Sequence, residues 1–260
     1  MNTSRRGLVL GLVWGLILLF TPRGYPATVE GFEAGDPVVT TAGDAIIKQT
    51  YQGVVPPQGL NQFLITTINS VGQDGTDGYS NQSGTNAVIN STLQTFFNST
   101  SLLGTEGSGF KLSIVVPVGM TTITFRYDFL TTEFPVADGG HADFAFALLF
   151  DATNTLLGGV RNIATPASID ESNPARLLPS GPTATNPFTF DTGYQTFTIS
   201  GLSPGTYTLG IGVEDRTTTD NPSGLLVDNI SVVPEPSTVG LGMAGAVLLI
   251  ALRRVIKKTS

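Results

Sequence analysis

The segment "TTITFRYDFL", residues Thr121–Leu130, decides the fold class, because its apolar and polar side chains alternate. In an extended strand, successive side chains point to opposite faces of the sheet. One face is apolar or aromatic and the other is polar: Ile123, Phe125, Tyr127 and Phe129 against Thr124, Arg126 and Asp128. A strand with one buried face and one wet face is typical of an antiparallel sheet.

Several other segments are rich in β-branched and aromatic residues and have the same period of two. They are Phe110–Val118, Ala142–Asp151, Tyr194–Ser200, Gly205–Asp215 and Gly224–Val233. The shorter runs Phe63–Ile68 and Thr92–Phe97 are at most short strands between long loops, and the Pro-rich segment Ala164–Pro187 is expected to be a surface loop. The pattern contains no convincing amphipathic helix. It predicts an all-β protein, an antiparallel two-sheet sandwich of jelly-roll type, as a single domain over residues 28–233.

The N-terminal end has the layout of a secretory signal peptide. Arg5 and Arg6 precede an apolar run from Leu8 to Phe20, and three helix-breaking residues follow before Ala27. We therefore predict a signal peptide over residues 1–27 that is removed on export.

The C-terminal end consists of Pro234-Glu235-Pro236, an apolar run over residues 238–252, and a basic tail that begins with Arg253 and Arg254. A fifteen-residue helix rises about 22 Å, against a hydrocarbon core of roughly 30 Å. We expect a short transmembrane helix over residues 238–252 whose basic flank stays in the cytoplasm. An ordinary single-span anchor is the alternative interpretation of this segment.

This order of three parts at residues 234–260 resembles the PEP-CTERM sorting signal of exported bacterial proteins. The resemblance implies recognition and cleavage near Pro234-Glu235-Pro236 by the membrane protease-transpeptidase exosortase. It also implies that the protein is tethered to the membrane by the C-terminal helix before processing, and then reaches the cell surface or the extracellular matrix.

The composition limits the partners. Between Thr28 and Val233 the chain has six basic and 19 acidic residues, a net charge of about −13 without a basic stripe. Nucleic acid is therefore an unsuitable partner, because phosphate binding needs clustered Lys and Arg. The chain has no Cys, which excludes disulfides, thiol catalysis and Cys-ligated zinc. The acidic balance favours a divalent cation, and calcium is the one cofactor that it suggests.

Parts of the exported chain resemble two kinds of known domain. Residues Thr124–Asp151 are similar to the central signature of choice-of-anchor domains, with the corner Thr132-Glu133-Phe134-Pro135 and the element Ala142-Asp143-Phe144. "EGFEAGDP" (Glu30–Pro37) and "LLVDNISV" (Leu225–Val232) resemble the first and last strands of jelly-roll carbohydrate-binding modules. In those modules an acidic residue from each end can meet at a structural calcium ion, and the matching positions here are Glu33 and Asp228.

Other polar groups are weaker candidates. Asp74, Asp77 and Asn81 could bind calcium, but they lack the EF-hand order and also suit a plain turn. Four residues close in sequence could form a cation or ligand site: Glu133, Asp138, His141 and Asp143. Four aromatic residues could be exposed and stack on sugars: Tyr51, Tyr79, Phe134 and Tyr194.

These observations favour a binding protein over an enzyme. His141 is the only histidine, and no nucleophile-elbow sequence accompanies it. We predict an exported envelope or matrix protein with a structural or adhesive role near extracellular polysaccharide. The alternative is a lectin-like carbohydrate-binding module. A glycan hydrolase is kept as a third hypothesis because acidic residues such as Glu171, Glu214 and Asp215 are abundant.

Overall fold

The computed structural model describes residues 27–36, 39–67, 88–132, 143–169, 177–179, 187–216 and 222–234. The elements in this part of the chain are β1 (Ala27–Glu30), β2 (Thr40–Ala42), β3 (Asp44–Lys48), β4 (Gln62–Thr66), β5 (Val88–Ile89), α2 (Asn90–Phe97), β6 (Glu106–Val116), β7 (Thr122–Thr131), β8 (Phe144–Phe150), β9 (Arg161–Ala164), the 3-10 helix η1 (Pro166–Ser168), β10 (Phe190–Asp191), β11 (Gln195–Ile199), β12 (Gly205–Asp215) and β13 (Ser223–Val233).

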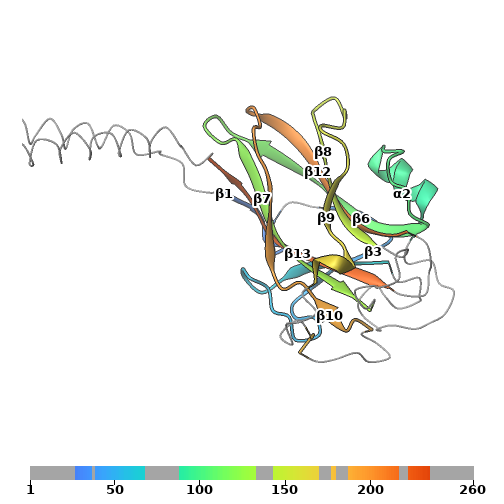
Figure 1. The fold of residues 1–260 in the computed structure, drawn as a ribbon. Helices are drawn as coiled ribbons and strands as arrows, with labels where there is room; N and C mark the ends of the chain where they lie inside the picture. Colours follow the sequence, from blue (N-terminus) through green and yellow to red (C-terminus); the bar gives the residue numbers. More distant parts are fainter. Residues whose placement is uncertain are drawn as a thin grey trace, which may run out of the picture.

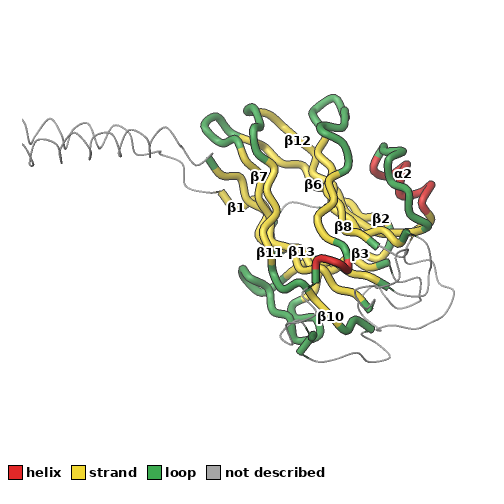
Figure 2. The backbone as a smooth tube through the Cα atoms, in the orientation of Figure 1, coloured by secondary structure: helices red, strands yellow, loops and turns green. Residues whose placement is uncertain are grey.

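The strands form two antiparallel sheets that pack face to face (Figures 1 and 2). Sheet A has the order β10-β7-β13-β4-β3, with β11 also paired to β7 and β1 to β13. Sheet B has the order β2-β6-β12-β8-β9, with β5 also paired to β6. The predicted all-β sandwich is therefore confirmed, and each long strand that the alternation predicted is present within a few residues of its expected bounds.

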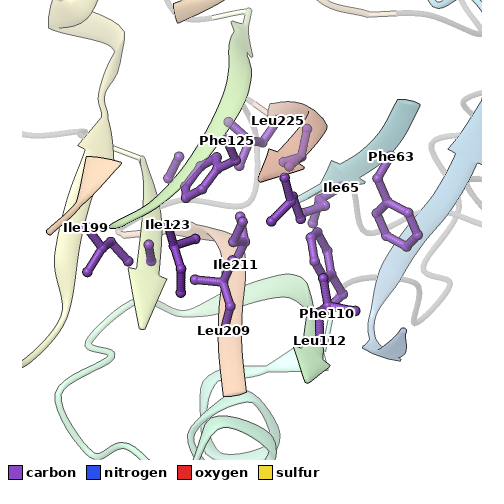
Figure 3. Close-up of a cluster of buried hydrophobic side chains, with 14 of the residues drawn as sticks. Phe63, Ile65, Phe110, Leu112, Ile123, Phe125, Ile199, Leu209, Ile211 and Leu225 are labelled. Carbon is purple, nitrogen blue, oxygen red and sulfur yellow. The ribbon is translucent and has the colours of Figure 1, made fainter. Parts of the chain in front are cut away.

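The space between the sheets is filled by one large apolar cluster (Figure 3). Phe63 and Phe110 lie 4.8 Å apart between ring centroids, so β4 of sheet A is in direct contact with β6 of sheet B. Ile123, Phe125 and Phe129 of β7 point into the same cluster and are at most 1% exposed. The prediction that these alternate residues share the buried face is confirmed. Burying such side chains stabilises the fold by about 1.5–3 kcal/mol each.

Helix α2 covers the outer face of sheet B (Figure 1). The prediction that Thr92–Phe97 is at most a short strand is wrong, because Leu93 and Phe97 stand four residues apart and share one helix face. Phe97 lies so close to β12 that a Cβ at Gly210 would come within 2.7 Å of its ring. Glycine backbone in the sheet thus makes room for an aromatic ring from the helix.

The outer face of sheet A is divided into an apolar half and a polar half. Leu64, Leu130 and Leu226 form an apolar cluster that Tyr51 and Phe188 cover from the connecting loops. Asp128 is 1% exposed, so the prediction of a wet polar face is wrong at this position. The physical reason is that Thr192, from the segment between β10 and β11, lies over it and donates a hydrogen bond to Asp128 Oδ1 (3.2 Å).

The predicted signal peptide, residues 1–27, lies outside the described residues except for Ala27. The predicted C-terminal helix, residues 238–252, lies outside them entirely, because the described chain ends at Pro234. Within the described part, no helix has the length and apolar character needed to span a membrane.

Candidate functional site

Glu33 lies in a turn directly after β1, and this turn is held by the carboxylate of Asp36. Asp36 Oδ2 accepts hydrogen bonds from the backbone N–H groups of Gly31 (3.0 Å) and Glu33 (2.8 Å). The Glu33 side chain reaches the loop between β3 and β4. Its Oε1 accepts the N–H groups of Leu60 (2.6 Å) and Asn61 (2.8 Å), and its Oε2 accepts the side-chain amide of Asn61 (2.9 Å).

Asp228 holds the same loop from the opposite direction. It lies in β13 where the pairing with β7 is interrupted by a bulge, and the next residue, Asn229, has a positive φ of 51°. Asp228 is fully buried, and its two oxygens accept the N–H groups of Asn229 (2.6 Å) and Gln58 (2.8 Å). We call Glu33, Asp228 and residues 58–61 the loop clamp.

The two acidic residues of the clamp interact electrostatically. Burial raises the pKa of Asp228 to about 6, the hydrogen bonds from Gln58 and Asn229 act in the opposite direction, and the Glu33 carboxylate raises the pKa further. The resemblance of the first and last strands to those of carbohydrate-binding modules therefore correctly predicted that Glu33 and Asp228 lie near each other. Glu33 and Asp228 come together across one loop.

The loop clamp does not have the donor set that calcium prefers. Calcium takes six to eight oxygen ligands, whereas all four carboxylate oxygens of Glu33 and Asp228 already accept N–H groups. An ion in this place would have to displace those donors. Among the described residues, no group of three or more His, Cys, Asp or Glu side chains is arranged to hold a metal ion. Calcium binding at the clamp stays a prediction.

Arg126 stands at the boundary between the clamp and the polar half of sheet A. It is the register partner of Asp228 on the neighbouring strand β7. Its guanidinium lies 6.0 Å from the ring centroid of Tyr194 and donates to the Tyr194 carbonyl oxygen (3.0 Å). The Tyr194 hydroxyl in turn donates to the side-chain carbonyl of Gln62. Burial raises the pKa of Tyr194, and the carboxylates of Asp128 and Asp228 add to that shift.

Beyond Arg126, the outer face of sheet A carries short hydroxyl side chains. Thr196 of β11 pairs with Arg126 and Thr198 pairs with Thr124, so all four side chains point to the same side of the sheet. Thr196 and Thr198 are exposed, and Thr124 and Arg126 are half-buried. We call these four residues the polar strip. Arg126 is its only charged residue, and none of the four belongs to the apolar cluster that the described residues form on the other half of this face.

A second group of acidic residues lies at the other end of the sandwich, where β6 begins and β12 ends. Glu106 and Asp215 are register partners and are 4% and 2% exposed. Glu106 Oε1 is buried without a hydrogen-bond partner. Burial raises the pKa of Glu106 to about 7, and the Asp215 carboxylate raises it further. We call Glu106 and Asp215 the carboxyl pair.

Glu214 lies next to this pair but on the opposite face of sheet B. It is fully buried, and its Oε1 accepts the N–H of Gly104 (2.5 Å). Its Oε2 has no hydrogen-bond partner. Burial raises the pKa of Glu214 to about 7, against the lowering effect of the Gly104 N–H.

The remaining predicted residues are placed only in part. Asp143, 2% exposed, precedes β8 at the end of the sandwich that holds the carboxyl pair. Its proposed partners Glu133, Asp138 and His141 lie outside the described residues, as do Asp74, Asp77 and Asn81.

The predicted sugar-stacking aromatics and sorting residues are also placed only in part. Tyr79 and Phe134 lie outside the described residues, as do Glu235, Pro236, Arg253 and Arg254. The prediction that Tyr51 is exposed is wrong, because it is 6% exposed and packs against Phe188. Tyr194 is half-buried beside Arg126.

Sequence reasoning missed the carboxyl pair, although a signal was present. Leu209, Ile211 and Val213 alternate toward the core, and Asp215 continues the same phase. Glu106 likewise stands in phase with Phe110 and Leu112 of β6. Extending the alternation to the strand ends would have placed both carboxyl groups on the buried face.

No family model and no curated protein sequence matches the chain. Similar solved structures include TmCBM61 in complex with β-1,4-galactotriose (10% identity, 80% of this chain and 99% of that chain, TM-score 0.41). They also include the K2 cleaved adhesin domain of Lys-gingipain (13%, 80% and 96%, TM-score 0.37) and the family 11 carbohydrate-binding module of a cellulase of Clostridium thermocellum (11%, 81% and 95%, TM-score 0.33). At these TM-scores the likeness carries no weight for function.

Proposed function

We propose that this chain is an exported, non-catalytic domain that binds extracellular polysaccharide through the polar strip of sheet A. The observation that carries the proposal is the guanidinium of Arg126, held against the ring of Tyr194 beside exposed hydroxyl groups. A guanidinium presents several donors in a fixed plane, which suits the neighbouring oxygens of a sugar. Because Tyr194 fixes the plane, little side-chain entropy is lost on binding.

The hydroxyl groups of Thr124, Thr196 and Thr198 extend this donor array across two strands. Each can donate and accept a hydrogen bond, as a sugar hydroxyl can. Side chains spread over two neighbouring strands suit a stretch of polymer lying on the sheet better than the end of a chain held in a deep pocket. A binding role also agrees with an acidic exported part, which would contact a neutral polysaccharide more readily than an anionic one.

Binding of the chain to soluble polysaccharides tests the proposal, with two neutral polymers, a galactan and a xylan, and the anionic polymer alginate as probes. We expect Arg126→Ala to weaken binding roughly 10- to 100-fold, because a hydrogen bond to a charged group contributes about 1.5–3 kcal/mol. Thr196→Ala should weaken it a few-fold. The matched control is Thr206→Ala, an exposed threonine on the outer face of sheet B. Equal affinity of all four proteins would refute the polar strip as the binding surface.

A structural or adhesive role without a glycan site is the second candidate. It is favoured by the burial of aromatic rings: in the described part of the chain, no Phe or Tyr side chain is exposed, so no ring platform for sugar stacking is present there. The same titration separates the two functions. A protein that binds none of the three polymers while it stays folded would be assigned to the structural role.

The sorting route is proposed from the sequence of the two ends. We infer that the chain is exported by residues 1–27, held in the membrane by residues 238–252, and released after exosortase cleavage near Pro234. The mass of the mature protein from its host tests this. A chain that ends near Pro234 would support cleavage, and an envelope protein intact through Ser260 would leave a plain anchor.

A further inference from the structure

The turn between β6 and β7 exposes apolar side chains that glycan binding at the polar strip does not use. Val118 is 89% exposed, the largest exposed fraction among the large apolar residues in the described part of the chain, and Val115 is 62% exposed. A hydrogen bond from the Met120 N–H to the Pro117 carbonyl oxygen (3.1 Å) closes a tight turn and leaves Val118 at its outer corner. We call residues 115–120 the hairpin tip.

The hairpin tip lies beside the last residues of β13. Thr122 of β7 pairs with Val233, and the N–H of Thr121 donates to the Val233 carbonyl oxygen (3.2 Å). Figure 1 shows the turn between β6 and β7 next to this end of β13. The start of β1 is at the same place, because Ala27 pairs with Val232. Both terminal segments of the chain therefore join the sandwich at the end that carries the hairpin tip.

The proposed membrane tether, residues 238–252, keeps this end of the sandwich close to the bilayer. Its apolar run begins at Thr238, and a fully extended chain covers at most about 18 Å between Val233 and that residue. A bilayer entered at residue 238 is therefore within reach of the hairpin tip. Tethering raises the effective concentration of lipid at the tip, so that even a small apolar contact can form.

The charge distribution favours the same contact. The exported part carries about −13, but the connection between β6 and β7, residues 117–121, contains no charged residue. The connection between β11 and β12, residues 200–204, also contains none, and it leads into β12 where that strand pairs with the end of β6. The connection between β8 and β9, residues 151–160, contains Asp151 alone. This end of an acidic domain therefore meets little repulsion from a lipid surface.

We propose that the hairpin tip is a membrane-contact site, an inference that rests on the proposed tether. While residues 238–252 hold the chain in a phospholipid bilayer, Val118 enters the interface between the headgroups and Val115 lies against it. The burial of exposed apolar surface drives the contact. The contact sets the tilt of the sandwich relative to the bilayer and keeps Pro234 near the surface, where a membrane protease can reach it.

Fluorescence quenching by lipid tests the proposal, because the chain has no Cys and a single label can be placed at a chosen residue. Variants of the full chain with one labelled Cys each are reconstituted in phosphatidylcholine vesicles, with and without lipid that is spin-labelled at the headgroup. Val118→Cys reports on the hairpin tip and Thr238→Cys on the start of the tether. We expect spin-labelled lipid to reduce the fluorescence at both positions.

Leu103→Cys is the matched control. Leu103 is also an exposed apolar residue (65%), but it lies beside the other end of β12, where the N–H of Thr105 donates to the Asp215 carbonyl oxygen. The length of β12 separates it from the hairpin tip by roughly 30 Å. We expect no quenching at this position.

The pattern of quenching separates the hairpin tip from the tether. Quenching at residue 238 without quenching at residue 118 would overturn the contact and leave the tether in place. Quenching at neither position would overturn both, and quenching at residue 118 alone would support the contact and remove the tether. Equal quenching at all three positions would also overturn the proposal, because the domain would then have no preferred end toward the membrane.

A second substitution checks that the contact is apolar. Val115→Asp, added to the labelled Val118→Cys chain, should reduce the quenching, because a carboxylate beside the label must be desolvated to enter the interface. Both positions are exposed, so neither substitution disturbs the core. Quenching that Val115→Asp leaves unchanged would contradict insertion of the hairpin tip.

Discussion

The loop clamp and the carboxyl pair each contain two acidic side chains, but the carboxylate oxygens are all hydrogen-bonded in the clamp and only incompletely so in the pair. In the clamp, every carboxylate oxygen of Glu33 and Asp228 accepts at least one N–H group. In the pair, Glu106 keeps a buried oxygen without a partner. The difference shows that the cost of burying an acid depends on the backbone around it rather than on the acid itself.

The backbone differs because one site lies among loops and the other among paired strands. The clamp meets a turn, a connecting loop and a bulge, where N–H groups are left over from the sheet ladders. Glu106 and Asp215 are the last pair of an unbroken eleven-residue ladder. With two N–H donors, buried Asp228 has a pKa of about 6, whereas burial raises the pKa of Glu106 to about 7.

The largest loss of stability is expected for Gly104→Ala, which disturbs the backbone beside the carboxyl pair and leaves its two carboxyl groups unchanged. An added Cβ would collide with Glu214 Cγ and with the carbonyl oxygen of Asp215, which the N–H of Thr105 also contacts (2.7 Å). Overpacking against backbone costs about 3 kcal/mol. We expect chemical denaturation to show this loss, with Gly205→Ala as the control, because its Cβ would meet only Tyr207 at 3.7 Å. Equal stability of the two variants would contradict the close packing at Gly104.

Removing an acceptor from the clamp should have the next largest effect. Glu33→Ala leaves the N–H groups of Leu60 and Asn61 without their acceptor, at a cost of about 2 kcal/mol. Glu33→Gln keeps one acceptor oxygen in the same place and is expected to lose only about half as much. Denaturation midpoints measure both. A glutamine variant that is as unstable as the alanine variant would mean that the negative charge, rather than the hydrogen bonds, holds the loop.

The pH dependence of stability tests whether the buried groups Glu106 and Glu214 hold their protons near neutral pH in the folded chain. The pKa of Glu106 and of Glu214 is about 7 in the folded chain, and an unperturbed glutamate has a pKa of about 4.3. The folded state therefore binds more protons between these values, so the free energy of unfolding falls as the pH rises from 5 to 8. We expect the melting temperature to fall over the same pH range, with a contribution from each of the two groups.

Glu106→Gln should remove part of this slope, because glutamine does not titrate. Calorimetry of the wild type and the variant at pH 5, 6.5 and 8 measures the effect. Stability that rises from pH 5 to pH 8 would show that the buried carboxyl groups are ionised in the folded chain and would contradict the assignment.

The sequence was most informative where alternation was uninterrupted. Ile123, Phe125 and Phe129 predicted the buried face of β7 because a strand has only two faces and the residues choose between them. The sequence wrongly predicted that Asp128 and Tyr51 are exposed, because chain segments distant in sequence pack together on the outer face of sheet A. Alternation within one strand carries no information about such covers.

The candidate sites show the same limit. Glu33 and Asp228 could be paired from the sequence because terminal strands often lie side by side, and here β1 does pair with β13. The use of their oxygens could not be predicted, since the donors come from the loop at Gln58 to Asn61. Arg126 could be placed on the polar face, but its contact with Tyr194 depends on the pairing of β7 with β11.

The smallest expected effect concerns calcium. If the N–H groups of Gln58, Leu60 and Asn61 already satisfy Glu33 and Asp228, a chelator has nothing to remove, and the melting temperature with EDTA should equal that with added calcium within about 1 °C. A bound ion would instead stabilise the folded state in proportion to the logarithm of its concentration. A melting temperature several degrees higher in calcium, lost in Glu33→Gln, would establish the ion at the clamp. It would also mean that the loop moves to expose these oxygens.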